Sequence, residues 1–173
     1  MNKSENSLHV LVVDDEQGIR EGAERILSRM GFTVSTASRG AAGLEIIYAE
    51  PVHIVFLDLK MPGIGGMEVL ARIKEFNEKI MVIVVTGFAT LETAIEAMKK
   101  GAYDFIPKPF EPDSLRMVVR RAQERMELSL EAERLEKERN RTLLDLDNEK
   151  SRTRTIIESL PNGVVVTLSL IHI

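Results

Sequence analysis

The chain has 173 residues, of which 44% are hydrophobic and 29% are charged, and its formal net charge is −4. It contains no cysteine, which excludes disulfides and thiolate metal sites and fits a reducing compartment. No apolar run approaches the roughly 20 residues of a membrane span, no basic excess indicates a nucleic-acid surface, and the polar residues 1–7 lack the apolar stretch of a secretory signal, so we expect a cytoplasmic protein that contacts neither membrane nor nucleic acid.

Five short runs rich in β-branched residues follow this polar N-terminal tail, and we predict a strand for each. Three of them, HVLVV, IVFL and MVIVV, are nearly continuous apolar runs, which is typical of parallel strands covered on both faces. The predicted strands are His9–Val13, Thr33–Thr36, Ile54–Leu57, Met81–Val85 and Asp104–Ile106.

Apolar residues recur at helical spacing after each of these runs, which predicts five helices. Gly31 and Gly101 stand just past the first and fourth helices, Thr90 stands where it can cap the fourth, and Pro112 opens the fifth. Strict alternation of strand and helix predicts an α/β fold. We expect a flavodoxin-like, doubly wound sheet of five parallel strands in the order 2-1-3-4-5, with a long C-terminal helix that extends the fifth helix.

Polar residues follow four of the predicted strands, at the edge where ligands bind in such sheets. Asp14 and Asp15 follow the first strand, and Asp58 follows the third. Thr86 follows the fourth and Lys108 follows the fifth. Clustered carboxylates repel each other unless a hard cation such as Mg²⁺ lies between them. A lysine and a hydroxyl opposite them suit the oxygens of a phosphoryl group, so the set predicts phosphoryl transfer to a carboxylate.

Each of these residues, taken singly, also fits a simpler role. Asp14 fits a helix cap, Asp58 fits a turn before Met-Pro-Gly, and Lys108 fits a solvated loop between two prolines. Thr86 stands beside a glycine and fits an ordinary loop. The simpler roles leave the shared position at one sheet edge unexplained, so we favour the phosphoryl site.

Four segments strongly resemble the receiver domain of response regulators in two-component signalling. They occur in the order of that family and at its natural spacing, and we assign residues 8–125 to this domain. The segments are LVVDDE (11–16), FLDLKMPGIGG (56–66), VVTGFA (84–89) and DFIPKPF (104–110).

The resemblance implies a phosphoacceptor and a metal site. Asp58 is the position that takes the phosphoryl group. Asp14 and Asp15 form an acidic pocket that holds Mg²⁺ together with Asp58. Asp15 is the expected direct ligand of the pair, and the backbone carbonyl of Lys60 is a further ligand.

The resemblance also implies a switch and a donor. Thr86 and Lys108 bind the phosphoryl group, and Thr86 acts with Phe105, which occupies the position of the switch aromatic residue. The peptide bond between Lys108 and Pro109 is expected to be cis. The donor is the phosphohistidine of a partner histidine kinase or phosphotransfer protein.

The fifth helix is expected to continue into a linker at residues 126–159, because the chain from Arg121 to Arg154 has neither glycine nor proline. A loose heptad repeat runs through this segment, with several polar residues on its seam. Two interpretations remain open. We favour a coiled coil that makes a homodimer through this helix, and the alternative is a single solvated helix.

The last residues carry two further expectations. The segment RTIIESLPNGVVVT (154–167) resembles the opening of a PAS sensor domain, so we expect residues 160–167 to begin a truncated PAS-like domain; a capped helix end followed by a stray strand is the alternative. The segment LSLIHI (168–173) back-translates to a sequence that resembles a transposase adapter of sequencing libraries, so we expect a non-native tail there.

These features together predict a phosphorylation-controlled signalling switch, which relays phosphorylation of Asp58 through the C-terminal helix to a downstream module. Two alternatives stay open. The chain is the front of a receiver–PAS histidine kinase, which is an enzyme, or it is a stand-alone receiver with a dimerisation helix. A phosphoacceptor histidine helix and an ATP-binding domain downstream would distinguish the kinase from the other two.

Overall fold

The central sheet has five parallel strands in the order β2-β1-β3-β4-β5, which confirms the order expected from the sequence. The structure is a computed structural model that describes residues 8–87 and 89–159. The strands are β1 (His9–Val13), β2 (Thr33–Ala37), β3 (Ile54–Leu57), β4 (Met81–Thr86) and β5 (Asp104–Pro107). The expected PAS-like segment at 160–167 and the expected non-native tail at 168–173 lie outside the described residues.

A helix follows every strand, and the ends of two of these helices obey local signals in the sequence. Gly31 and Gly101 have φ values of 93° and 91°, which suit glycine at a helix C-terminus. The Thr90 hydroxyl accepts the backbone N–H of Thr93, and the Thr93 hydroxyl accepts that of Thr90, which completes a capping box. The helices are α1 (Gln17–Arg29), α2 (Gly40–Ala49), α3 (Gly66–Phe76), α4 (Leu91–Lys99) and α5 (Pro112–Ser159).

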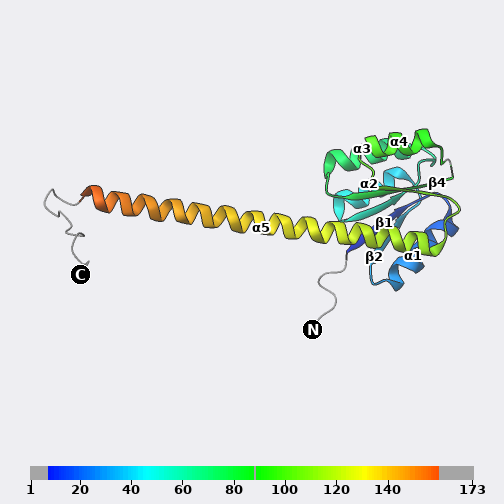
Figure 1. The fold of residues 1–173 in the computed structure, drawn as a ribbon. Coiled ribbons are helices and arrows are strands. Elements are labelled where there is room, and N and C mark those ends of the chain that lie inside the picture. Colours follow the sequence, from blue (N-terminus) through cyan, green and yellow to red (C-terminus); the bar gives the residue numbers. More distant parts are fainter. Residues whose placement is uncertain (1–7, 88, 160–173) are drawn as a thin grey trace. The chain divides into compact units, whose positions relative to one another are not determined.

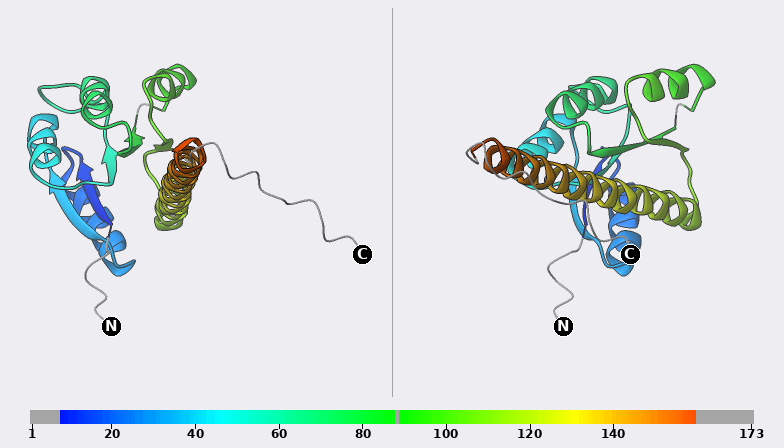
Figure 2. Two further views of the ribbon diagram at one scale, coloured as in Figure 1. Left: turned by 90° about the vertical axis from the view of Figure 1, so that its left-hand side faces the viewer. Right: turned by 60° about the vertical axis from the view of Figure 1, so that its left-hand side comes forward.

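Both faces of the sheet are covered by helices, which explains the nearly continuous apolar strands. Leu11 and Val13 of β1 lie in a core cluster with residues of α2, α3 and α4. Val12 faces the opposite side, where it lines a small cavity with Ala23 of α1 and Leu115 of α5. Figures 1 and 2 show α2, α3 and α4 on one side of the sheet and α1 with the start of α5 on the other. Polar side chains of β1, β3 and β4 are therefore confined to the strand ends.

The chain divides into two units, Met1–Arg125 and Met126–Ile173. The first contains the sheet and the first turns of α5, where Leu115, Val119 and Ala122 are buried. Within the part of the chain that the structure describes, no helix combines the length and the apolarity that a membrane crossing requires. The part of α5 in the second unit carries six leucines that are more than half exposed: Leu128, Leu130, Leu135, Leu143, Leu144 and Leu146.

Two histidines meet where β1 and β3 begin, at the sheet edge remote from the polar strand ends. The backbone N–H of His9 donates to Nδ1 of His53 at 3.1 Å, and the backbone N–H of His53 donates to the carbonyl of His9 at 2.9 Å. Nε2 of His9 lies 2.8 Å from the Ser35 hydroxyl and 3.7 Å from the Glu50 carboxylate. Burial of the His53 ring, and then the neighbouring His9 ring, lower the pKa of His53. Because Nδ1 of His53 accepts the His9 N–H, the folded chain favours the ring with no proton on that nitrogen.

This pair predicts that the folded state loses stability as the pH falls. The pKa of His53 is lower in the folded chain than the ordinary value of about 6.5. The contribution of this histidine to folding stability is therefore fully present above that value, and it is lost as the pH falls through the folded pKa. His53→Asn retains an acceptor near the position of Nδ1 and cannot titrate. Between about pH 7 and about pH 5, we expect the melting temperature to fall less in His53→Asn than in the wild-type chain. An equal fall in melting temperature with pH in the two chains would contradict the assignment of this pH dependence to His53.

Candidate functional site

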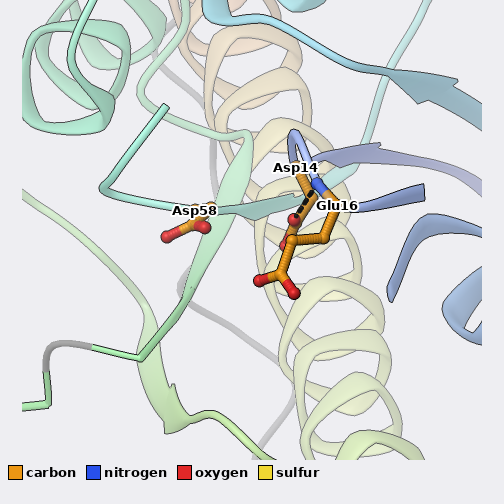
Figure 3. A group of neighbouring side chains, drawn as sticks. All are labelled: Asp14, Glu16 and Asp58. Carbon is orange, nitrogen blue, oxygen red and sulfur yellow. Dashed lines mark hydrogen bonds between the residues drawn. The ribbon is translucent and has the colours of Figure 1, made fainter. Parts of the chain in front are cut away.

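The candidate site lies where β1 and β3 end, and sheet pairing continues one residue beyond each strand, with Asp58 bonded to β1 and Asp14 bonded to β2. The backbone N–H of Asp58 donates to the carbonyl of Val13 at 2.9 Å, and the backbone N–H of Asp14 donates to the carbonyl of Ala37 at 3.0 Å. Both carboxylates therefore come to the same sheet edge. Figure 3 shows them beside Glu16, which belongs to the loop after β1.

Lys108, which follows β5, donates to all three of these carboxylates. Its Nζ lies 2.7 Å from Asp14 Oδ2, 2.8 Å from Asp58 Oδ2 and 2.9 Å from Glu16 Oε1. The side chains of Lys108, Asp14 and Asp58 are 8%, 2% and 6% exposed, whereas that of Glu16 is 61% exposed. The site is thus a buried ion cluster with one partner at the surface.

Burial and hydrogen bonding oppose each other in this cluster. Burial raises the pKa of Asp14, and the hydrogen bond from Lys108 only partly offsets that rise. Burial alone would lower the pKa of Lys108, but its hydrogen bonds to Asp14, Asp58 and Glu16 outweigh burial and raise it. Lys108 therefore stays an ammonium group at any physiological pH, and the carboxylates face a fixed positive charge.

The carboxylates have the chemistry that a divalent cation requires. One oxygen each from Asp14, Glu16 and Asp58 lie within 4.8 Å of one another. Three carboxylates, when ionised, carry two more charges than the one ammonium group of Lys108 can balance. Mg²⁺ carries two positive charges, prefers oxygen ligands and retains several waters, so the residues present fit this ion.

The other expected metal-site residues lie beside this cluster. Asp15 is exposed, and its carboxylate is absent from the group of three oxygens among the residues described. Lys60 is exposed too, and its backbone N–H donates to Asp58 Oδ1 at 3.1 Å, which places its peptide next to the phosphoacceptor candidate. Glu16 joins the cluster, although no pattern favoured it over Asp15; the signal available was a third acidic residue in the run Asp-Asp-Glu.

The expected switch residues lie on β4 and β5, which are neighbours in the sheet. Thr86 is fully buried as the last residue of β4, and its carbonyl accepts the backbone N–H of Lys108 at 2.9 Å. Phe105 is paired with Val84 in the strand register and packs, partly buried, against the core. The peptide bond between Lys108 and Pro109 is cis, as the resemblance implied.

A family model described as "Response regulator receiver domain" matches residues 10–120 of the chain. The NtrX-like response regulator of Rickettsia typhi is 41% identical over 128 residues, which cover 73% of this chain and 27% of that protein. The DNA-binding transcriptional regulator NtrC of Escherichia coli K12 is 37% identical over 113 residues, 65% of this chain and 24% of that protein. The chain thus spans about a quarter of the length of these curated relatives.

Solved structures with the same architecture cover most of the chain. NtrX from Brucella abortus superimposes with a TM-score of 0.71 at 37% identity, over 75% of this chain and 30% of that one. A CheY-like receiver domain protein from Methanospirillum hungatei superimposes with a TM-score of 0.70 at 28% identity, over 72% of this chain and 99% of that one. The described fold up to the start of α5 is therefore the receiver architecture.

Gly66, the first residue of α3, lies against the backbone that carries Asp58. Its N–H donates to the carbonyl of Leu59 at 3.1 Å. A Cβ at this position would lie 2.5 Å from the Leu59 Cα and closer still to the carbonyl oxygen of Asp58. Both are backbone atoms, so neither can turn aside as a flexible side chain would. The position of Asp58 thus depends on the missing side chain at residue 66.

Gly66→Ala is expected to destabilise the fold by roughly 1–3 kcal/mol, as overpacking does in cores. This loss comes in spite of the roughly 1 kcal/mol by which alanine favours a helix over glycine. Gly22→Ala is the matched control, since Gly22 lies inside α1 and an added Cβ would meet nothing within 4 Å beyond the neighbouring backbone of its own helix. Urea denaturation measures both, and the control is expected to be neutral or more stable. Equal unfolding free energies for the two variants would show that the contact with Asp58 is of no consequence.

Proposed function

The chain belongs to the response regulator receiver domain family, and we propose that it accepts a phosphoryl group on Asp58 from the phosphohistidine of a partner histidine kinase or phosphotransfer protein. The observation that carries this proposal is the hydrogen bond of 2.8 Å between the buried Asp58 carboxylate and Lys108, beside two further carboxylates. The Asp58 carboxylate is thus positioned as a nucleophile, and the adjacent ammonium group of Lys108 can balance negative charge on the aspartyl phosphate that forms.

The chemistry follows from the groups around Asp58. A carboxylate oxygen of Asp58 attacks phosphorus, the bond from phosphorus to the histidine nitrogen breaks, and the imidazole leaves with that electron pair. Lys108 already donates to Asp58 and stabilises the charge on the phosphoryl oxygens. Mg²⁺, which Asp14, Asp58, the Lys60 carbonyl and Glu16 or Asp15 would hold, neutralises the remaining charge when bound.

The signal is proposed to pass through Thr86 and Phe105 to α5. Phosphorylation places nearly two negative charges beside Thr86, whose hydroxyl then turns toward a phosphoryl oxygen. Phe105 lies on the adjacent strand, partly buried against the core, and is proposed to move inward in response. Phe110 and Leu115 line a small cavity with Asp14 and Asp58, which gives the start of α5 a short path to the same site.

The output of the whole protein is a separate proposal. We favour a switch that acts through α5 on a downstream module, and the names of its relatives include a DNA-binding transcriptional regulator. A receiver–PAS histidine kinase, with residues 160–167 as the start of the PAS-like domain, is the enzyme alternative, and a stand-alone receiver with a dimerisation helix is the third. The downstream reading frame separates them, since a kinase needs a histidine helix and an ATP-binding domain.

Asp58→Asn is expected to abolish phosphorylation, because the amide nitrogen that replaces one oxygen removes the anionic nucleophile. Incubation with a small phosphodonor and Mg²⁺, followed by intact-mass spectrometry, should add one phosphoryl group to the wild-type chain and none to the variant. Removal of the divalent ion with a chelator should suppress the wild-type reaction. Asp113→Asn, a substitution at an exposed carboxylate of α5, is the control and should label fully. Full labelling of Asp58→Asn would sink the assignment.

We also propose that the second unit pairs two chains through α5. Leu128 and Leu135 are 63% and 58% exposed, stand seven residues apart, and belong to the seam of the heptad repeat together with Leu146. Leucines on one stripe of a helix are the side chains that a coiled coil buries. Residues 126–159 are accordingly proposed as a coiled-coil linker.

Self-association should depend on the seam leucines and not on leucines in general. In sedimentation equilibrium of the whole chain, Leu128→Ala with Leu135→Ala should weaken the dimer about tenfold or more, since burial of each leucine contributes about 1.5–3 kcal/mol. Leu130→Ala with Leu144→Ala is the matched control, because these exposed leucines lie on the opposite side of the heptad repeat. A wild-type chain that stays monomeric at high micromolar concentration, or an equal effect of both pairs, would rule the pairing out.

A further inference from the structure

The loop between β1 and α1 supplies two of the three clustered carboxylates, yet its helix end has no side-chain cap. Glu16 is the N-cap residue of α1, and its side chain accepts no backbone N–H. It points to Lys108 instead. A helix start usually fixes the preceding loop through a Ser, Thr, Asp or Asn side chain at this position. The loop is held in part by itself, because the Asp14 carboxylate accepts the backbone N–H of Glu16, while the carbonyls of Asp14 and Asp15 are held from outside the loop.

Arg20, one turn into α1, contacts this backbone. Its Nη1 donates to the carbonyl of Asp14 at 2.7 Å and to the carbonyl of Asp15 at 2.9 Å. The residue is half-buried, and its hydrogen bond to Asp14 is partly shielded from water, whereas the one to Asp15 is exposed. Hydrogen bonds from a charged donor are about twice as strong as neutral ones. One nitrogen thus holds two successive peptide planes.

Those two planes decide where the acidic side chains leave the loop. Asp14 is held at every other polar group: its N–H by Ala37, its Oδ1 by the N–H of Glu16 at 3.0 Å and its Oδ2 by Lys108. The Asp14 carbonyl is the remaining group, and Arg20 holds it. Rotation of either peptide plane would turn the carboxylates of Asp15 and Glu16 to new directions, since a side chain moves with its own backbone.

We propose that Arg20 is a positioning residue for the cation pocket, which orients the carboxylates of the Asp14–Glu16 loop without touching the cation itself. The inference rests on the proposed function, because the pocket matters only if it takes up Mg²⁺. Arg20 would supply hydrogen bonds outside the ligand shell, of the kind that hold metal ligands in their orientation.

The sign of the effect distinguishes positioning from simple charge. As a positive charge near a cation pocket, Arg20 repels Mg²⁺, so its removal on that ground alone would tighten binding. As a positioning residue, it preorganises the ligands, so its removal weakens binding. Partners of metal ligands typically contribute 10–100-fold to affinity. The two accounts therefore predict opposite changes in the same dissociation constant.

The test is a titration of the whole chain with Mg²⁺ at constant ionic strength, followed by the amide NMR signals of residues 14–16 and 58–60. Arg20→Met retains a long apolar stem and removes the donors, and about a tenfold or greater rise in the dissociation constant is expected. Arg25→Met is the control, an exposed arginine of the same helix, and should bind as the wild-type chain does. Urea denaturation establishes that each variant is folded.

An Arg20→Met chain that is folded and binds Mg²⁺ as tightly as the wild-type chain, or more tightly, overturns the inference alone. If that variant does not fold, Arg20→Lys decides: it retains the charge and loses the guanidinium geometry, and an unchanged dissociation constant overturns the inference where a rise supports it. A wild-type chain that binds no Mg²⁺ overturns the proposed function and the inference with it.

Discussion

The candidate site depends on the ion pairs that the ammonium group of Lys108 makes with two buried carboxylates. Asp14 and Asp58 are almost wholly buried, and Lys108 donates to both. Loss of one partner from a buried ion pair typically costs about 3–5 kcal/mol, because a charge is left without compensation. Burial already raises the pKa of Asp14 in the presence of Lys108, so without the lysine this carboxyl would be still easier to protonate. A single ammonium group thus lies against both buried carboxylates and offsets part of the burial that raises the pKa of Asp14.

The geometry of the site is set mainly by backbone. Asp58 is fixed by its N–H on Val13, by the packing of Gly66 on its carbonyl, by the N–H of Lys60 on one carboxylate oxygen and by Lys108 on the other. Such fixing supplies orientation before any ligand arrives, which is how proteins reduce the entropic part of a reaction barrier. The covered faces of the sheet require this arrangement, because β1, β3 and β4 offer polar side chains only at their ends.

The sequence pattern was sufficient for the sheet, the caps and the residues at the strand ends. Apolar runs indicated buried strands, Thr90 and Gly101 indicated the limits of α4, and Asp14, Asp58 and Lys108 do meet. The pattern could not choose among the three consecutive acids, since their directions depend on peptide planes held by Arg20, a contact of tertiary structure. It also gave no sign that His9 and His53, 44 residues apart, would be joined by the register of β1 and β3.

Glu16 is exposed, whereas the other two carboxylates of the cluster are buried. This difference in burial decides which ion pair of Lys108 is the easiest to break. The Glu16 side chain is 61% exposed, so its ion pair with Lys108 contributes on the order of 0–1 kcal/mol. Separation of Lys108 from Asp14 or Asp58 would leave a buried carboxylate without its cation and costs several times more. Any anion that draws Lys108 toward it therefore displaces Glu16 first, and the released carboxylate returns to the water that already surrounds it. Acidic residues that are close in the sequence thus have different roles, because the fold buries Asp14 and leaves Glu16 exposed.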